Sequence, residues 1–319
     1  MKKIVYSFIL LGIVGFVFYG IIVCVSDINA TKAETDVQLR DKNNEEYIYK
    51  EQLLHLGYTI EDVNIIEKKV SNTDAKKYLL NEKYDNLTKF IASPYFKIEN
   101  ISRYNNYYNN NTYTIDNAVI YVNIGLDNEF YSTIKEITDY NEVTALVNKY
   151  NKLPSNYEAS ELVSLDKDYS ESECKVKQVI LSSLKQMMDD VKNEGMKLNV
   201  ISGYRTESTQ ENLFNNSVKK NGESHALIYS AKPGHSEHQL GLAVDFNNVT
   251  ENFKDTKEYE WLKNNSYKYG FIERYPKDKE FITGYGYEPW HYRYLGIDIA
   301  TKIYQEGITY EEYLVKYAK

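Results

Sequence analysis

The chain has 319 residues, of which 42% are hydrophobic, and a formal net charge of -8 at pH 7. This length can bury a sizeable core in one large domain or two smaller ones, and we take two as the working number. The acidic balance argues against nucleic-acid binding, which depends on Lys and Arg clustered on one face.

The first predicted element is an apolar segment near the N-terminus. Residues 4–25 form a run of 22 residues without a charged side chain, and a helix needs about 20 apolar residues to span a bilayer. A secretory signal peptide has a shorter apolar region and a small-x-small cleavage site, which this sequence lacks. Lys2 and Lys3 precede the run and Asp27 follows it. By the positive-inside rule, residues 1–3 are predicted to be a cytoplasmic tip, and the chain beyond the uncleaved anchor to be extracytoplasmic.

The two cysteines lie in segments too different to suggest a disulfide between them. Cys24 lies inside the apolar run and Cys174 lies on a distant segment, so we expect both to be small buried residues. A lipid-attachment role for Cys24 is disfavoured because Val23 precedes it.

Residues 26–46 are polar and charged without an apolar period, which is typical of a linker. Residues 47–145 form an N-terminal region in which three apolar clusters, at 52–58, 75–84 and 87–93, are spaced like short helices. In the same region we predict a strand at 118–124, which is rich in β-branched residues, and a loop over the Asn-rich residues 103–113. No motif assigns this region a function, so a wall-binding domain and a structural lead-in both stay open.

Residues 146–319 are predicted to be the second domain, an α+β fold with an antiparallel sheet and flanking helices. The elements expected in it are an extended connection at 146–163 broken by Pro154, an amphipathic helix over 174–195, a strand within 197–204, a helix opened by Thr206 or Ser208, short strands within 242–246, 268–275, 280–285 and 290–296, and helical residues over 300–317.

The stretch 233–246, PGHSEHQLGLAVDF, carries the first candidate ligands. Histidine nitrogen and carboxylate oxygen are natural zinc ligands, and catalytic zinc sites use three protein ligands with the fourth position left to water. His238 and Asp245 supply two such donors, although this spacing also occurs by chance.

A second cluster, YEPWHYRY at 287–294, adds Glu288 and His291. His291 can complete the coordination and Glu288 can take a proton from water, as a carboxylate base does in zinc hydrolases. An aromatic-rich core turn with a surface Glu is the alternative for this stretch.

The third cluster, SGYRTESTQ at 202–210, places Arg205 after a strand and a Gly-Tyr turn. A guanidinium held there can bind a carboxylate at two points or stabilise an oxyanion. Taken alone, an arginine in this position is more often a surface charge.

Together, in this order, the three clusters resemble the VanY-like zinc-dependent D-alanyl-D-alanine carboxypeptidases, over about residues 146–305. That family belongs to a wider group that includes the lysostaphin-type peptidases and the hedgehog fold. The resemblance implies a hedgehog and D-Ala-D-Ala peptidase-like fold for residues 146–319, with a Zn²⁺ cofactor.

The resemblance also implies a role for each motif residue. It implies that the Zn²⁺ ligands are His238, Asp245 and His291, that Glu288 is the general base, that Arg205 holds the substrate carboxylate or the tetrahedral intermediate, and that Gln210 and Ser236 contact the peptide. His235 is expected beside the ligands or at the pocket rim, and His225 is expected to be solvent-exposed.

The expected function is therefore that of a membrane-anchored carboxypeptidase that removes the C-terminal D-alanine from peptidoglycan stem peptides. Removal of D-alanine from tetrapeptide stems by an L,D-carboxypeptidase is one alternative. A non-catalytic, zinc-containing cell-wall binding module is another, which an intact Glu288 and Arg205 disfavour. The oligomeric state stays open.

Overall fold

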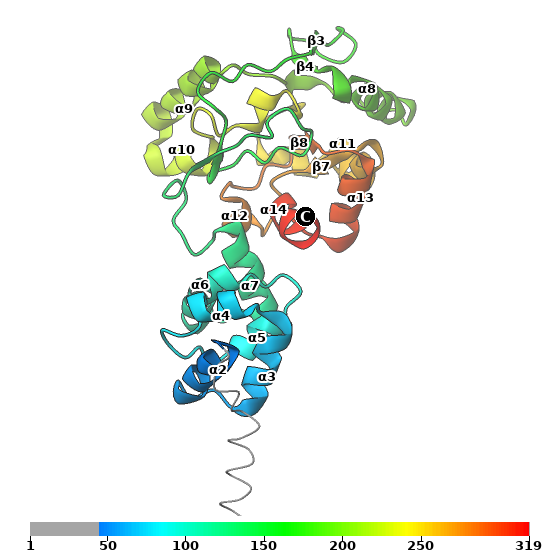
Figure 1. Ribbon diagram of the computed structural model, residues 1–319. Coiled ribbons are helices and arrows are strands. Elements are labelled where there is room, and N and C mark those ends of the chain that lie inside the picture. Colours follow the sequence, from blue (N-terminus) through cyan, green and yellow to red (C-terminus); the bar gives the residue numbers. More distant parts are fainter. Residues whose placement is uncertain (1–44, 319) are drawn as a thin grey trace, which may run out of the picture. The chain divides into compact units, whose positions relative to one another are not determined.

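The computed structural model describes residues 45–318 (Figure 1). The predicted cytoplasmic tip, the anchor at 4–25 and nearly all of the linker lie outside these residues. Within the described range, no helix has the length and apolar character required to cross a membrane. The chain forms two compact units that divide between Asn105 and Asn106.

The first unit is helical in its described part. Its elements are α2 (Glu45–His55), α3 (Ile60–Lys69), α4 (Asn72–Tyr78), α5 (Leu87–Ala92), the 3-10 turn η1 (Ile98–Asn100) and α6 (Ile101–Asn109), which runs past the division. The helices expected from the three apolar clusters are confirmed as α2, α4 and α5. A capping box between Thr59 and Asp62 starts α3.

The loop predicted over the Asn-rich residues 103–113 is wrong for residues 103–109, because α6 extends to Asn109, and is confirmed for residues 110–113. Ile101 and Tyr104 are both buried, one helical turn apart, and the Tyr104 ring lies 5.8 Å from that of Phe90. Burial of this face outweighs the weak helix propensity of asparagine.

The strand predicted at 118–124 is also wrong, since these residues belong to α7 (Ile115–Ile124) in the second unit. The Thr114 side chain caps its start, and Gly125 ends it at φ 107°. A short buried apolar run cannot be assigned to helix or strand by its periodicity. Here the caps and the packing of α7 against α14 (Tyr310–Tyr317) favour the helix.

The remaining elements of the second unit follow in chain order. They are β1 (Lys135–Glu136), β2 (Asn151–Lys152), β3 (Leu162–Ser164), β4 (Lys175–Lys177), α8 (Gln178–Asn193), β5 (Val200–Ser202), α9 (Glu207–Asn221), α10 (Glu223–Tyr229), η2 (Glu237–Leu240), β6 (Ala243–Phe246), η3 (Glu251–Asp255), α11 (Lys257–Asn265), η4 (Ser266–Tyr269), β7 (Phe271–Glu273), α12 (Glu280–Thr283), β8 (His291–Tyr294) and α13 (Ile297–Glu306) before α14.

Most of the predicted elements of this unit are confirmed. Thr206 caps α9, as expected, and the helical C-terminal stretch is α13 and α14. The strand expected within 280–285 is wrong, because these residues form the single turn α12 and then reverse at Gly284.

A four-stranded antiparallel sheet in the order β5-β6-β8-β7 is the centre of the second unit and confirms the predicted α+β class. Because side chains alternate across a strand, Val244 and Tyr292 enter the apolar core that α8 covers. The intervening residues Asp245, His291 and Arg293 lie on the opposite face.

Residues 106–145, which we placed in the N-terminal region, belong to the same compact unit as the sheet. Arg293 on β8 donates to the carbonyl oxygens of Val143 and Ala145, at 2.8 and 2.9 Å. Farther along, the Tyr150 hydroxyl donates to the Asn128 carbonyl at 2.8 Å. The Arg293 bonds tie the end of this segment to the sheet, and the Tyr150 bond ties Asn128 to the chain that follows, so the unit begins earlier than the predicted residue 146.

Candidate active site

Asp245 and His291 are brought together by the register of the sheet. They are direct partners on the antiparallel strands β6 and β8, so their side chains leave the sheet on the same face. His238 comes from η2, immediately before β6, and Gly241 turns the chain between them at φ 69°. A Cβ at Gly241 would lie 3.2 Å from the backbone nitrogen of Lys177, so this turn requires glycine.

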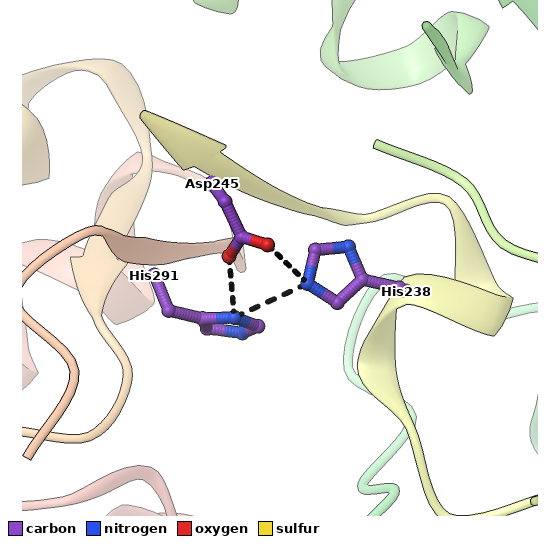
Figure 2. Close-up of side chains that lie close together, drawn as sticks. All are labelled: His238, Asp245 and His291. Atoms are coloured by element: carbon purple, nitrogen blue, oxygen red, sulfur yellow. Dashed lines mark hydrogen bonds and ion pairs between the residues drawn. The ribbon is translucent and has the colours of Figure 1, made fainter. Parts of the chain in front are cut away.

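The three side chains converge on one point (Figure 2). His238 Nε2 lies 3.3 Å from Asp245 Oδ2 and 3.3 Å from His291 Nδ1, and His291 Nδ1 lies 3.0 Å from Asp245 Oδ1. Ligands about 2.0–2.1 Å from a tetrahedral zinc ion lie roughly 3.3 Å apart. All three residues are buried, and their spacing and donor set fit Zn²⁺.

Hydrogen bonds on the far side of each ring set the histidine tautomers. His238 Nδ1 lies 2.7 Å from the Gly203 carbonyl oxygen, which can only accept, so Nδ1 carries the proton and the Nε2 lone pair lies on the cluster side, where it accepts from Arg205 Nη2 at 3.1 Å. His291 Nε2 lies 3.5 Å from Glu237 Oε2, which leaves Nδ1 on the cluster side. Ligand histidines are commonly oriented in this way.

The protonation states of two of the three side chains, His238 and Asp245, suit metal binding. Burial, together with the Arg205 charge, lowers the pKa of His238 to about 4, so its imidazole is neutral. Burial opposes ionisation of Asp245, but contacts with His238, His291 and Arg205 outweigh it and hold the Asp245 pKa well below its ordinary value. Hydrogen bonds to Asp245 and Glu237 outweigh burial and raise the pKa of His291 to about 9, so this imidazole has to release a proton when it binds a metal.

Glu288 lies at the edge of the cluster, with Oε2 3.8 Å from His291 Nδ1. Its backbone nitrogen donates to the Tyr275 carbonyl, and its own carbonyl accepts from the His291 nitrogen, each at 3.1 Å. Burial raises the pKa of Glu288 to about 8. The residue is buried, which excludes the surface Glu that the sequence allowed, and a carboxyl group in this environment can exchange a proton near neutral pH.

Arg205 reaches the same cluster from the end of β5. Nη2 donates to Asp245 Oδ2 at 2.7 Å, Nη1 donates to Gln210 Oε1 at 3.1 Å and Nε donates to Ser202 Oγ at 3.0 Å. Its side chain is 21% exposed, so it is not an ordinary surface charge. It offers a fixed cation with partial access to solvent beside the ligands.

Gln210 and Ser236, predicted to contact the peptide, are both buried. Gln210 accepts from Arg205, and its Nε2 donates to the Ala231 carbonyl at 2.9 Å. Gln210 therefore holds Arg205 in place. Ser236 immediately precedes η2, which carries His238.

The other histidines lie apart from the cluster. His235 is buried, with Nδ1 2.8 Å from the Asn148 carbonyl oxygen and its ring edge-on to Tyr131. His225 and His55 are exposed. Within residues 45–318, the group of side chains able to hold a metal is His238, Asp245 and His291.

The sequence motifs predicted no role for Glu237, which also belongs to this site. It is fully buried between His291 and two arginines, Arg274 and Arg293. The signal in the sequence was a glutamate beside a candidate ligand, together with an arginine in each of two apolar strands, at 268–275 and 290–296. A buried charge needs a partner of opposite sign, so these residues could have been paired.

Comparisons with known proteins agree with this geometry. The sequence model of the family described as VanY, D-alanyl-D-alanine carboxypeptidase, matches residues 173–297. The chain is 42% identical to the putative carboxypeptidase YodJ of Bacillus subtilis over 210 residues, covering 61% of this chain and 77% of that protein. It is 39% identical to a D-alanyl-D-alanine carboxypeptidase of Enterococcus faecalis, covering 57% and 70%. Among solved structures, the LD-carboxypeptidase LdcB is similar with a TM-score of 0.54 and 41% identity, covering 59% of this chain and 93% of that one.

Proposed function

Because the chain belongs to the VanY family of D-alanyl-D-alanine carboxypeptidases, we propose that it removes the C-terminal D-alanine from peptidoglycan stem peptides. It is a zinc metallocarboxypeptidase. The observation that carries the substrate proposal is one buried cluster that combines three metal donors with a carboxyl group and a guanidinium. A metal site with a purely structural role would not need the last two groups.

His238, Asp245 and His291 would hold the zinc, which fits their donor spacing and tautomers. When bound, zinc supplies a Lewis acid that lowers the pKa of water and polarises the scissile carbonyl. Asp245 also accepts a hydrogen bond from Arg205, so the ligand carboxylate and the cation hold each other in position.

Glu288 would act as the general base and then as the acid. Its carboxylate takes a proton from the attacking water and passes it to the nitrogen of the departing D-alanine. Its burial at the edge of the cluster excludes bulk water from this transfer. The raised pKa suits a group that both accepts and returns a proton near neutrality.

Arg205 would bind the terminal carboxylate of the peptide or the negative charge that develops on the scissile carbonyl oxygen. Its guanidinium is held on three sides by Ser202, Gln210 and Asp245. A donor that is already oriented does not have to reorganise during the reaction. Gln210 would act through Arg205, which it holds in place, and Ser236 would contact the peptide.

Carboxypeptidase activity on tetrapeptide stems is the second candidate. It is supported by the similarity to LdcB, which is an LD-carboxypeptidase. The two activities differ in the bond that is cut, because the residue before the terminal D-alanine is D-alanine in a pentapeptide and an L-centre of lysine or diaminopimelate in a tetrapeptide.

The deciding experiment measures D-alanine release from pentapeptide and tetrapeptide stems by the full-length chain. We expect release from pentapeptides that stops with a zinc chelator and with Glu288→Gln, while the exposed-site variant Glu211→Gln keeps wild-type activity. Release from tetrapeptides alone would establish the L,D-activity. Zinc binding and wall binding without D-alanine release would instead establish a non-catalytic module. D-alanine release that is unchanged by both the chelator and Glu288→Gln would contradict the proposed mechanism.

We also propose that the enzyme is held at the outer face of the cell membrane by residues 4–25, on the strength of their uncharged apolar sequence. An anchored chain stays with membranes through alkaline carbonate extraction, whereas a variant that begins at residue 27 is released. Equal release of both chains would contradict the anchor.

A further inference from the structure

Glu237 is a buried carboxylate whose two oxygens have different partners. Oε1 accepts hydrogen bonds from Arg274 Nε at 2.8 Å and from Arg293 Nη1 at 2.9 Å. Oε2 lies 3.5 Å from His291 Nε2, on the side of the ring away from the cluster. One carboxylate thus connects two arginines with a candidate metal ligand.

Arg274 continues this connection to the C-terminal helix. Its two terminal nitrogens donate to Glu311 on α14, at 3.0 and 2.6 Å, and Glu311 Oε1 also accepts from Asn148 Nδ2 at 3.2 Å. Glu237, Arg274, Arg293 and Glu311 together form what we call the buried ion network. It holds two negative and two positive charges, with side chains no more than 1% exposed.

Stability alone does not account for such a network. Taking four charges out of water costs more than most ion pairs return, and apolar residues of similar volume often serve as well. A network that lies against a ligand histidine has a second use, because it fixes an acceptor on the far side of that ring. The Tyr275 ring, 4.9 Å from that of His291, packs on the imidazole but does not select its tautomer.

We propose that Glu237 is a positioning residue for His291, and that Arg274 and Arg293, which both donate to Glu237 Oε1, hold Glu237 in place. Glu237 accepts the Nε2 proton, so that the Nδ1 lone pair of His291 is directed at the metal position beside Asp245. The zinc affinity of the site is therefore set partly by Glu237, whereas Glu311, at the far end of the network, contributes to stability. This inference rests on the proposed function, because it concerns the same metal centre.

The variants Glu237→Gln and Glu311→Gln separate positioning from general stability. Each variant replaces one buried carboxylate, and in both cases that carboxylate is a partner of Arg274. In Glu237→Gln the single amide oxygen must serve Arg274 and Arg293, so the amide nitrogen faces His291 Nε2 and two donors oppose each other. In Glu311→Gln the contact of Glu237 with His291 is unchanged.

The test is the zinc dissociation constant of the full-length chain, measured by competition with a chromophoric chelator, alongside Tm. We expect both variants to lower Tm. We expect Glu237→Gln to weaken zinc binding by about 10- to 100-fold, the usual effect of removing a partner behind a ligand, and Glu311→Gln to weaken it by less than about threefold. Equal losses in the two variants, or none in Glu237→Gln, would overturn the proposal.

A measurement on the wild-type chain covers the case in which Glu237→Gln does not fold. Nitrogen-15 NMR of the zinc-loaded protein should show His291 protonated at Nε2 and not at Nδ1, and the opposite tautomer would overturn the proposal. Failure of the proposed function is a different result, in which the wild-type chain releases no D-alanine. A wild-type chain that is active and whose affinity is unaffected by Glu237→Gln contradicts the positioning role alone.

Discussion

Asp245 and His291 face each other across β6 and β8, with Asp245 Oδ1 3.0 Å from His291 Nδ1. A cross-strand pair of this kind is held by the backbone hydrogen bonds of both strands, so two of the three candidate metal donors are in place once the sheet has formed. A shift of one residue in the register would turn one of them into the apolar core.

We expect Asp245→Asn to abolish D-alanine release and to weaken zinc binding more than the variants in the buried ion network do. The substitution keeps the size of the side chain but removes the charge that attracts the metal and pairs with Arg205. Zinc competition and a D-alanine assay measure both effects. The exposed Asp168→Asn is the control, and an active Asp245→Asn enzyme would contradict the ligand assignment.

Gln210→Ala should lower kcat/KM for stem peptides by about 10- to 100-fold, the equivalent of one lost hydrogen bond to a charged group. The variant frees one side of Arg205 and leaves the Ala231 carbonyl without its donor. Because Gln210 acts through Arg205, adding Gln210→Ala to Arg205→Ala should cause little further loss. Glu211→Ala on the same helix is the control, and additive losses would show that Gln210 acts independently of Arg205.

The turn at Gly241 should be intolerant of any side chain. Gly241→Ala forces a Cβ to within 3.0 Å of Leu162 Cδ2 and 3.2 Å of the Lys177 nitrogen, at φ 69°. Gly195→Ala is the matched control, because its φ is 79° and nothing lies within 4 Å of the added carbon. Urea denaturation should show about 1–2 kcal/mol lost in the control from backbone strain, and about 1–3 kcal/mol more in Gly241→Ala from overpacking. Equal losses would mean that the crowding is relieved elsewhere.

Glu273 should make the protein less stable as the pH rises. Burial raises its pKa to about 7, against the opposing effects of Tyr259 and Lys263, from an ordinary value of 4.5. Below pH 4.5 the carboxyl is protonated in both the folded and the unfolded chain and has no effect. Between pH 4.5 and 7 the folded chain binds more protons, so the free energy of unfolding falls as the pH increases.

Glu273→Gln removes this dependence, because a neutral amide can still accept from the Tyr259 hydroxyl. Denaturation at a series of pH values should show the variant equal to the wild type near pH 4. Above pH 7 it should be more stable than the wild type by up to about 3 kcal/mol. The exposed Glu173→Gln should show no such trend, and a variant whose advantage does not change with pH would contradict this role of Glu273.

The local sequence predicted the secondary structure correctly where apolar spacing and turn or cap residues indicate the same element. The helix α8, the capped start of α9 and the strands β5 to β8 were each predicted from apolar spacing and turn residues. Prediction failed at α6, α7 and α12, where short apolar or Asn-rich stretches suit more than one conformation. There, the burial of Tyr104 and the caps of α7 decide the outcome, and these depend on contacts outside each segment.

The sequence by itself predicted which residues carry the chemistry. The three motifs contain His238, Asp245, His291, Glu288 and Arg205, and their residue types already indicate a zinc hydrolase. The side-chain chemistry makes each role possible, and the resemblance of the three motifs to the VanY family assigns it.

Only the tertiary structure decided how these residues act together. His238 and His291 are 53 residues apart in sequence, yet their ring nitrogens lie 3.3 Å apart. The partners of Glu237 are likewise distant, since Arg274 and Arg293 follow it by 37 and 56 residues. Contacts of this kind depend on strand register and on which side chains are buried together, and a linear pattern of residues specifies neither.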